Sequence, residues 1–125
     1  MIGTSRITYK NMDIVTKGLF KDLTPADVAE DDYYTDPVNT TQCVHQVYIQ
    51  IVGEEGADHS APVGAFSVEV SLDAVHWYPN WDEFSMPSGE SNIYIENEWT
   101  SAYFRMKVAK GAITGGKFTG TVFGN

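Results

Sequence analysis

The segment Ala65–Asp73 constrains the fold of this chain more than any other, because from Phe66 onward its side chains alternate strictly between apolar and polar. The apolar, inward series is Phe66, Val68, Val70 and Leu72, and the polar, outward series is Ser67, Glu69, Ser71 and Asp73. A period of two is typical of a β-strand with one face on a core and the other in water. We expect Asp73 and Ala74 to begin a tight turn, Val75–Tyr78 to return as the partner strand, and Pro79 to end that strand. The sequence therefore predicts a β-hairpin here.

Further segments are rich in β-branched and aromatic residues and are bounded by turn residues, as short strands usually are. They are Thr4–Lys10, Asp13–Thr16, Gln42–Gly53, Asn92–Glu96, Ala102–Ala109 and Lys117–Phe123. Gln42–Gly53 has apolar side chains on both faces, which predicts a central strand with Cys43 as an inert buried thiol within it. Gly120 is expected to allow a bulge or a close approach. In Ala102–Ala109 we expect Phe104, Met106 and Val108 to point inward, and Arg105 and Lys107 to point outward.

One short helix and several loops complete the expected fold. Thr24 suits an N-cap and Pro25 the first helical position, so a helix of one or two turns is expected there. Residues 30–41 are expected to form a loop across the surface, and residues 54–62 and 80–89 to form two more loops. This order of elements predicts an all-β fold, an antiparallel β-sandwich or flattened barrel of about seven or eight strands with one short helix.

The chain length of 125 residues fits one domain, residues 1–125. Within it we expect an extended N-terminal arm at residues 1–12 and a long acidic connector at residues 22–42. The N-terminal segment Met1–Lys10 is polar, and no apolar run approaches the ~20 residues of a membrane helix. We therefore expect a soluble protein that enters neither the secretory route nor a membrane.

Acidic and basic residues occupy different parts of the chain. Residues 22–98 contain every acidic residue except Asp13, and no Lys or Arg. The basic residues lie before and after this block: Arg6, Lys10, Lys17, Lys21, Arg105, Lys107, Lys110 and Lys117. The net charge of −9 disfavours direct binding to nucleic acid. Two explanations of the segregation stay open, since the basic ends can pair with the acidic block within one domain or with the block of a neighbouring copy.

We predict no catalytic residues, no metal site and no cofactor. The histidines lie far apart in the sequence and lack the spacing of metal ligands: His45, His59 and His76. The acidic segment Glu30–Asp36 lacks the spacing of an EF-hand, and we interpret it as a solvated loop. Asp82 and Glu83 form a carboxylate pair, but adjacent strand residues rarely face one substrate together.

Aromatic residues are concentrated between Trp77 and Phe104, and both of these are assigned to the core. Others lie in or beside predicted loops, where large rings pack in the core, contact other subunits or stack against sugars. We predict contacts with other subunits at five residues, through burial of Trp81, Phe84 and Trp99 and through charge pairing of Arg105 and Lys107.

Residues 64–125 resemble a known family. The stretches GAFSVEVSLDAVHWYP and AYFRMKVAKGAITGGKFTGTVFGN are similar to small β-sandwich structural proteins encoded among the virion genes of tailed bacteriophages. The shared positions are Glu69, Val70, Ser71, Asp73 and Trp77, then Phe104, Arg105 and Met106, then Gly115 and Gly116. Ala74 stands where that family usually has Gly in the first turn.

The resemblance implies a non-enzymatic virion component, either a capsid decoration (cement) protein or a head, neck or tail accessory. It further implies assembly in the host cytoplasm with other virion proteins, as a homo-oligomer or on a larger lattice. The loop aromatics leave a second function open, a carbohydrate-binding or host-attachment β-sandwich module. A sugar binder is expected to act as a monomer, whereas a decoration protein is expected to oligomerise or to bind an assembled shell.

Overall fold

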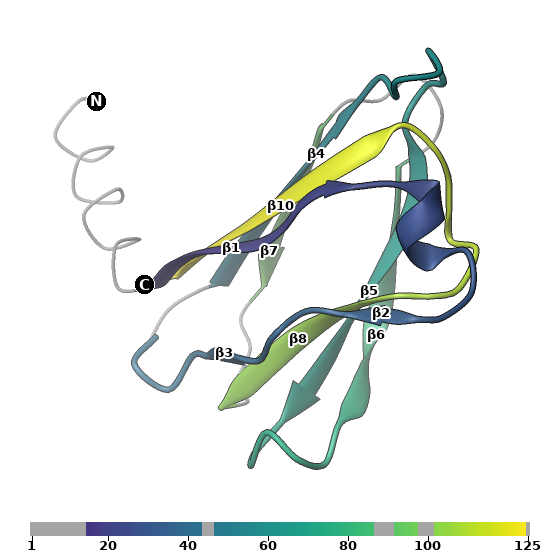
Figure 1. Cartoon of the computed structure of the whole chain (residues 1–125). Helices are drawn as coiled ribbons and strands as arrows, with labels where there is room; N and C mark the ends of the chain where they lie inside the picture. Colours follow the sequence, from purple (N-terminus) through teal and green to yellow (C-terminus); the bar gives the residue numbers. More distant parts are fainter. Residues whose placement is uncertain (1–14, 44–46, 87–91, 98–101, 125) are drawn as a thin grey trace, which may run out of the picture.

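The computed structural model describes residues 15–43, 47–86, 92–97 and 102–124, with side chains at 17–43, 47–80, 84–86 and 102–124. Two antiparallel sheets lie face to face (Figure 1). The elements are β1 (Val15–Leu23), the 3-10 helix η1 (Pro25–Val28), β2 (Tyr33–Tyr34), β3 (Val38–Asn39), β4 (Val47–Glu54), β5 (Val63–Ser71), β6 (Tyr78–Met86), β7 (Asn92–Asn97), β8 (Tyr103–Val108), β9 (Ile113–Gly115) and β10 (Lys117–Gly124). Within the described part of the chain, no helix has the length and apolar character needed to cross a membrane.

The strand order confirms the predicted antiparallel β-sandwich with one short helix. The first sheet has the order β1-β10-β4-β7, and the second has the order β2-β8-β5-β6, with β3 also on β8 and β9 on β5. β4 lies between two other strands, as its two apolar faces predicted. The first and last described strands pair with each other, so that Val15 is opposite Gly124. The structure has more strands than the sequence predicted. The additional strands β2, β3 and β9 are only two or three residues long, which is too short to show a repeating pattern in the sequence.

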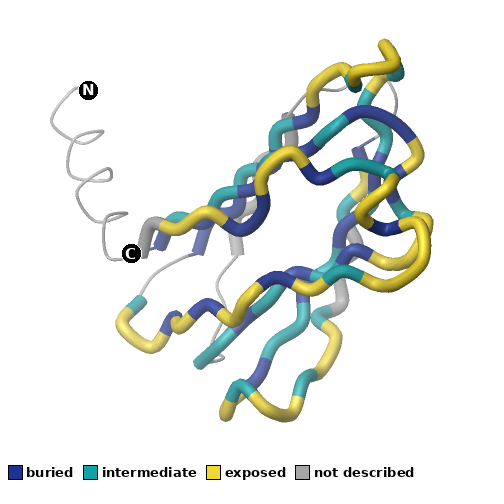
Figure 2. Tube along the Cα trace, viewed as in Figure 1, coloured by how far each residue is buried: buried dark blue, intermediate teal, exposed yellow. Residues whose placement is uncertain are grey.

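Three phenylalanines join the two sheets. Phe66 on β5 lies 5.8 Å from Phe20 on β1 and 5.1 Å from Phe118 on β10, measured between ring centroids. The rings of Phe66 and Phe118 meet edge to face at 71°, a geometry that aromatic pairs prefer. All three rings are buried, and alternate residues of the strands around them are buried as well (Figure 2). Phe104, Met106 and Val108 belong to this core, as predicted.

Gly120 on β10 lies directly beneath the Phe20 ring. A Cβ at this position would collide with the ring, and the β1–β10 pairing shifts register between Gly18 and Phe20. The close approach expected at Gly120 is therefore present, whereas the extra residue at the register shift is Leu19 on β1 and not a residue of β10.

The β5–β6 hairpin is built differently from the prediction. β5 ends at Ser71, and Leu72 is 79% exposed, so its predicted inward orientation is wrong. β6 starts at Tyr78 and continues to Met86, which makes the predicted loop at residues 80–89 wrong over most of its length. Pro79 does not end the strand, because β6 is the outer strand of its sheet and needs no N–H on its free side.

The N-terminal half also differs from the prediction. The predicted strand Thr4–Lys10 lies outside the described residues. The strand expected to end at Thr16 runs instead from Val15 to Leu23. Residues 30–41 form more than a loop, because β2 and β3 within them pair with β8.

The predicted helix after β1 is confirmed as a single 3-10 turn, η1. The Thr24 backbone N–H donates to the Asp27 carboxylate over 2.9 Å, which closes the N-terminal end of this turn. Cys43 is not inside a strand as predicted, because it lies in a turn where its N–H donates to the Thr40 carbonyl. Its side chain is half-buried against the core, and this burial raises the pKa of the thiol.

Candidate functional site

Arg105 projects from the outer face of β8 between two aromatic rings. Its guanidinium carbon lies 4.2 Å from the centroid of the Tyr34 ring and 4.4 Å from the centroid of the Trp77 ring. Its Nε and one terminal nitrogen each lie 2.7 Å from Oε1 of Glu69 on β5. Arg105 and Glu69 are opposite each other in the β5–β8 register, so strand pairing itself brings the two charges together. We call Tyr34, Glu69, Trp77 and Arg105 the arginine stack.

The arginine stack explains why one core assignment is wrong. Trp77 is half-buried on the outside of the sheet, where its ring covers the Arg105 cation, and it does not enter the core. The side chains of Arg105 and Glu69 are only 23% and 15% exposed. Two cation–π contacts and a charge-assisted hydrogen bond therefore hold the guanidinium in a single orientation.

Basic residues after the acidic block pair with acids of the same chain. Arg105 pairs with Glu69, and Lys107 Nζ lies 3.7 Å from a carboxylate oxygen of Asp32. Lys117 Nζ lies 3.9 Å from Glu54. These contacts support pairing within one domain as an explanation of the segregated charge. The predicted pairing of Arg105 and Lys107 with a neighbouring copy stays a prediction.

The turn between β5 and β6 is closed by its own side chains. The Ser71 hydroxyl oxygen accepts the N–H groups of Asp73 and Ala74 over 3.2 and 2.9 Å. One carboxylate oxygen of Asp73 accepts the N–H groups of Val75 and His76, both over 2.9 Å. The other carboxylate oxygen lies 2.7 Å from the His76 ring, and these bonds hold the pKa of Asp73 far below its usual range. Because the side chains supply the hydrogen bonds, the turn has a defined shape.

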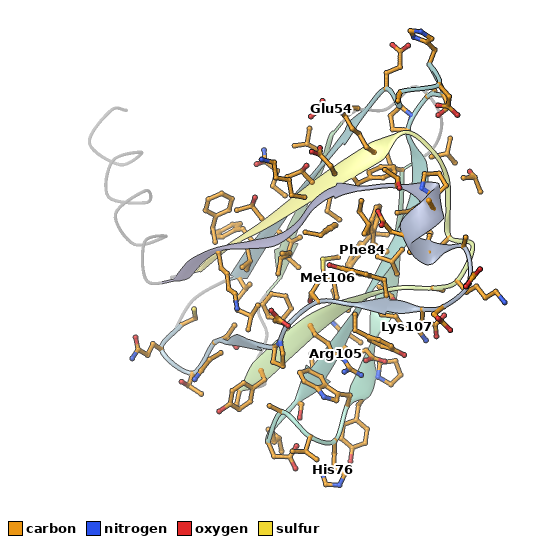
Figure 3. The ribbon with its side chains drawn as sticks, viewed as in Figure 1. Glu54, His76, Phe84, Arg105, Met106 and Lys107 are labelled. Atoms are coloured by element: carbon orange, nitrogen blue, oxygen red, sulfur yellow. The ribbon has the colours of Figure 1, made fainter. Side chains whose placement is uncertain are left out.

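Three apolar side chains stand out from this turn into solvent. Leu72 is 79% exposed, Val75 71% and Tyr78 63%. The turn forms one end of the molecule, where His76 is labelled in Figure 3 and the trace is mostly exposed in Figure 2. We call the residues from Leu72 to Tyr78 the hairpin tip. It presents apolar surface on an ordered backbone.

Replacing Ala74 by Gly should stabilise the protein by about 0.5 kcal/mol. Ala74 has a φ of 60°, where an L-residue is strained by about 1 kcal/mol or more and Gly is not. The greater freedom of Gly in the unfolded chain offsets part of this gain. Urea unfolding should show a higher midpoint with an unchanged slope. Ala57→Gly is the matched control, because Ala57 is exposed without a positive φ, and it should lower the midpoint.

Of the predicted contact residues, Arg105 and Lys107 lie together on one face of β8, 4.2 and 5.9 Å from the centroid of the same Tyr34 ring. Phe84 pairs with Phe66 across β5 and β6 and packs against the core, between the sheets (Figure 3). Trp81 belongs to β6, but its side chain is outside the described set, and Trp99 lies outside the described residues. Their role as contacts stays a prediction, and so does that of Phe84.

The sequence pattern did not identify three of the exposed apolar side chains, Tyr34, Leu72 and Val75. A usable signal was the pair Ser71 and Asp73, because both side chains commonly bond to nearby backbone N–H groups and so end a strand.

A cavity of about 570 Å³ lies at the opposite end of the sandwich from the hairpin tip. It is bounded by η1 on one side and by the loop before β5 on the other. Its walls include small apolar side chains at Pro25, Ala26 and Ala57, and Glu55, Asp58 and Lys117 add charge. Hydrogen bonds from Ser60 lower the pKa of Asp58. Among the described residues, no group of three or more His, Cys, Asp or Glu side chains is arranged to hold a metal ion.

No family model matches this sequence, and no curated protein is significantly similar to it. Among solved structures, the fold is similar to that of the PBSX exported protein XepA, with a TM-score of 0.63 and 14% identity. The match covers 92% of this chain and 38% of XepA, so this chain spans well under half of that protein. A carbohydrate-binding module from glycoside hydrolase family 9 (Cel9A) of Ruminococcus flavefaciens FD-1 aligns with a TM-score of 0.47 and 15% identity. That alignment covers 87% of this chain and 95% of the module, but it is too distant to support an argument. The comparison with XepA shows that this chain has a β-sandwich fold also found in an exported protein of PBSX.

Proposed function

We propose that this chain is a bacteriophage structural protein that acts through protein–protein contacts and not through catalysis. The observation behind this proposal is the hairpin tip, where Leu72, Val75 and Tyr78 are exposed together. Apolar side chains grouped on a protein surface favour burial against a partner. Because the hydrogen bonds of Ser71 and Asp73 already order the tip, binding costs little further conformational entropy.

Two similarities support a phage origin. Residues 64–125 resemble virion proteins of tailed bacteriophages, and the fold resembles that of XepA, an exported protein of the phage PBSX. We assign the chain to the virion, as a capsid decoration protein or as a head, neck or tail accessory.

Purified particles of the phage that encodes this chain provide the test. Mass spectrometry of gradient-purified particles should detect the chain in many copies per particle. Its absence from the particles, with the chain present in the lysate, would overturn the proposal. Particles made without the chain should bind the added protein, and Val75→Asp should weaken that binding at least tenfold, which is about 1.4 kcal/mol. Ala109→Asp adds the same charge at an exposed alanine away from the tip and should bind like the unchanged protein.

The carbohydrate-binding alternative depends on an aromatic ring with an open face. Arg105 already contacts the Tyr34 and Trp77 rings, which leaves Tyr78 as the more exposed ring at the tip. A glycan array is the direct comparison. Saturable binding of a free oligosaccharide that Tyr78→Ala abolishes would favour the sugar-binding module over the virion protein.

A further inference from the structure

We propose that copies of this chain exchange their N-terminal arms, residues 4–10 of one copy adding as a strand to the edge of β7 in another copy. The inference goes beyond the proposed function, because it concerns a contact of the chain with itself and does not involve the hairpin tip. It rests on the structure of the sheet edges, on the charge and pattern of two segments, and on the distance that separates them in one chain.

Most outer strands of the two sheets are protected against pairing with another chain. β1 pairs with β10 through two register shifts, and Lys17 and Lys21 on it are exposed. β6 contains Pro79, and its pairing with β5 has a register shift. β2 and β3 are only two residues long. Bulges, lysines, prolines and short strands all hinder the addition of another strand.

β7 is an outer strand without these features (Figure 1). It pairs with β4 over six residues without a register shift, and no described strand pairs with its other side. Its sequence, NIYIEN, contains no Lys, Pro or Gly. A regular edge of this kind presents backbone N–H and C=O groups to which a further strand can bond. The first sheet is therefore best suited to extension at β7.

The arm and the β7 edge have opposite charges. Residues 90–98, which include β7, contain three acidic residues and no basic residue. Residues 4–10 contain Arg6 and Lys10 and no acidic residue. Opposite charges on neighbouring strands stabilise their pairing, whereas like charges oppose it. The charge of the arm therefore favours its addition to this edge.

The apolar positions of the two segments match as well. In an extended arm, Ile7 and Tyr9 share one face, and the two basic residues share the other. In β7, Ile93 and Ile95 stand opposite buried residues of β4, and Glu96 belongs to the alternate set of positions. An added arm can therefore extend the core face with its apolar residues while its cations share the face of position 96. The match holds for either strand direction, because both directions alternate with a period of two.

The arm of the same chain is too short to reach this edge. β1 and β7 are the two outer strands of one sheet, so a strand added to β7 lies four strand spacings, about 19 Å, from β1. From Lys10 to Val15, where β1 starts, a fully extended chain spans at most about 18 Å. The chain would also have to turn at both ends of that span. The segment that pairs with β7 therefore comes from another copy.

Sedimentation velocity of the full chain tests the exchange. The unchanged protein should grow in mass with concentration, and raising the salt concentration should weaken this association by screening the opposite charges. Ile7→Pro removes a backbone N–H from the arm and should weaken self-association about tenfold or more. Ile2→Pro makes the same substitution outside residues 4–10 and should assemble like the unchanged protein. Equal association of Ile7→Pro and the unchanged protein would overturn the proposal.

Two charge reversals distinguish another copy from the same chain. Lys10→Glu and Glu96→Lys each place like charges at the contact, so each variant alone should associate about tenfold more weakly. In a mixture, the arm of each variant meets the edge of the other with opposite charges, so association should return to the level of the unchanged protein. An arm paired with β7 of its own chain gains nothing from mixing. A mixture that associates no better than its components would therefore contradict exchange between copies.

Hydrogen exchange gives a second readout at the edge itself. Where the unchanged protein assembles, amides of Asn92–Asn97 should exchange faster in Ile7→Pro than in the unchanged protein, whereas amides of Tyr103–Val108 should not differ. Circular dichroism should show that every variant is folded, and if Glu96→Lys is not, the arm variants and the exchange rates still decide the question. If the unchanged protein stays monomeric at all concentrations, the inference fails, while detection of the chain in particles would still uphold the proposed function.

Discussion

Replacing Phe66 by Ala should lower the free energy of unfolding by about 3–5 kcal/mol. Phe66 is 1% exposed and contacts Phe20 and Phe118 across the space between the sheets. Removing the ring therefore opens a cavity at the point where the sheets join, and the surrounding strands can close it only in part. Urea unfolding should show a large fall in midpoint with little change in slope.

Tyr78→Ala is the matched control for Phe66→Ala. The Tyr78 ring is 63% exposed, so its removal should change the free energy of unfolding by about 0.5 kcal/mol or less. Domains of this size have total stabilities of about 5–15 kcal/mol, so Phe66→Ala is expected to bring the protein close to unfolding. Phe66→Leu keeps most of the apolar volume and provides a measurable folded variant. Equal effects of Phe66→Ala and Tyr78→Ala would contradict the packing described for Phe66.

Replacing Arg105 by Ala should cost about 2–3 kcal/mol, the second largest effect we expect. The substitution removes two cation–π contacts and leaves the Glu69 carboxylate, 15% exposed, without its partner. Arg105→Lys should recover only part of the loss. Lysine keeps the charge but has no planar group to lie between Tyr34 and Trp77.

A double-mutant cycle isolates the contact with Glu69. Arg105→Ala should cost less in a Glu69→Gln background, with a coupling free energy of about 1–2 kcal/mol. Lys107→Ala is the comparison for an exposed pair, since Lys107 and Asp32 are 31% and 40% exposed and should contribute less than about 1 kcal/mol. Additive effects of Arg105→Ala and Glu69→Gln would show that the two residues do not interact in solution.

The sequence predicts the elements whose side chains alternate or are apolar on both faces. β5, β7, β8 and β10 lie close to their predicted positions, and the inward residues of β8 are the predicted ones. In β5, β8 and β10 periodicity succeeds because buried side chains alternate with more exposed ones along the strand.

The hairpin tip and the arginine stack were not predicted, for two physical reasons. The Ser71 and Asp73 side chains accept hydrogen bonds from backbone N–H groups and so end β5 before its apolar pattern ends, and Leu72 follows the pattern but points into solvent. The stack joins Tyr34, Trp77 and Arg105 from three separate segments, and such long-range contacts depend on the order of strands in the sheet. Local pattern contains no information on that order.

The pairing of the first and last described strands has a mechanical consequence. Val15 lies opposite Gly124, so a force that pulls these two ends apart would peel β1 from β10 one hydrogen bond at a time. A pull between the hairpin tip and the loop before β5 acts on the two ends of one extended strand, so the covalent backbone of β5 carries the load and no hydrogen bonds are opened in sequence. The domain is therefore expected to resist tension far better along its strands than across the junction of its ends.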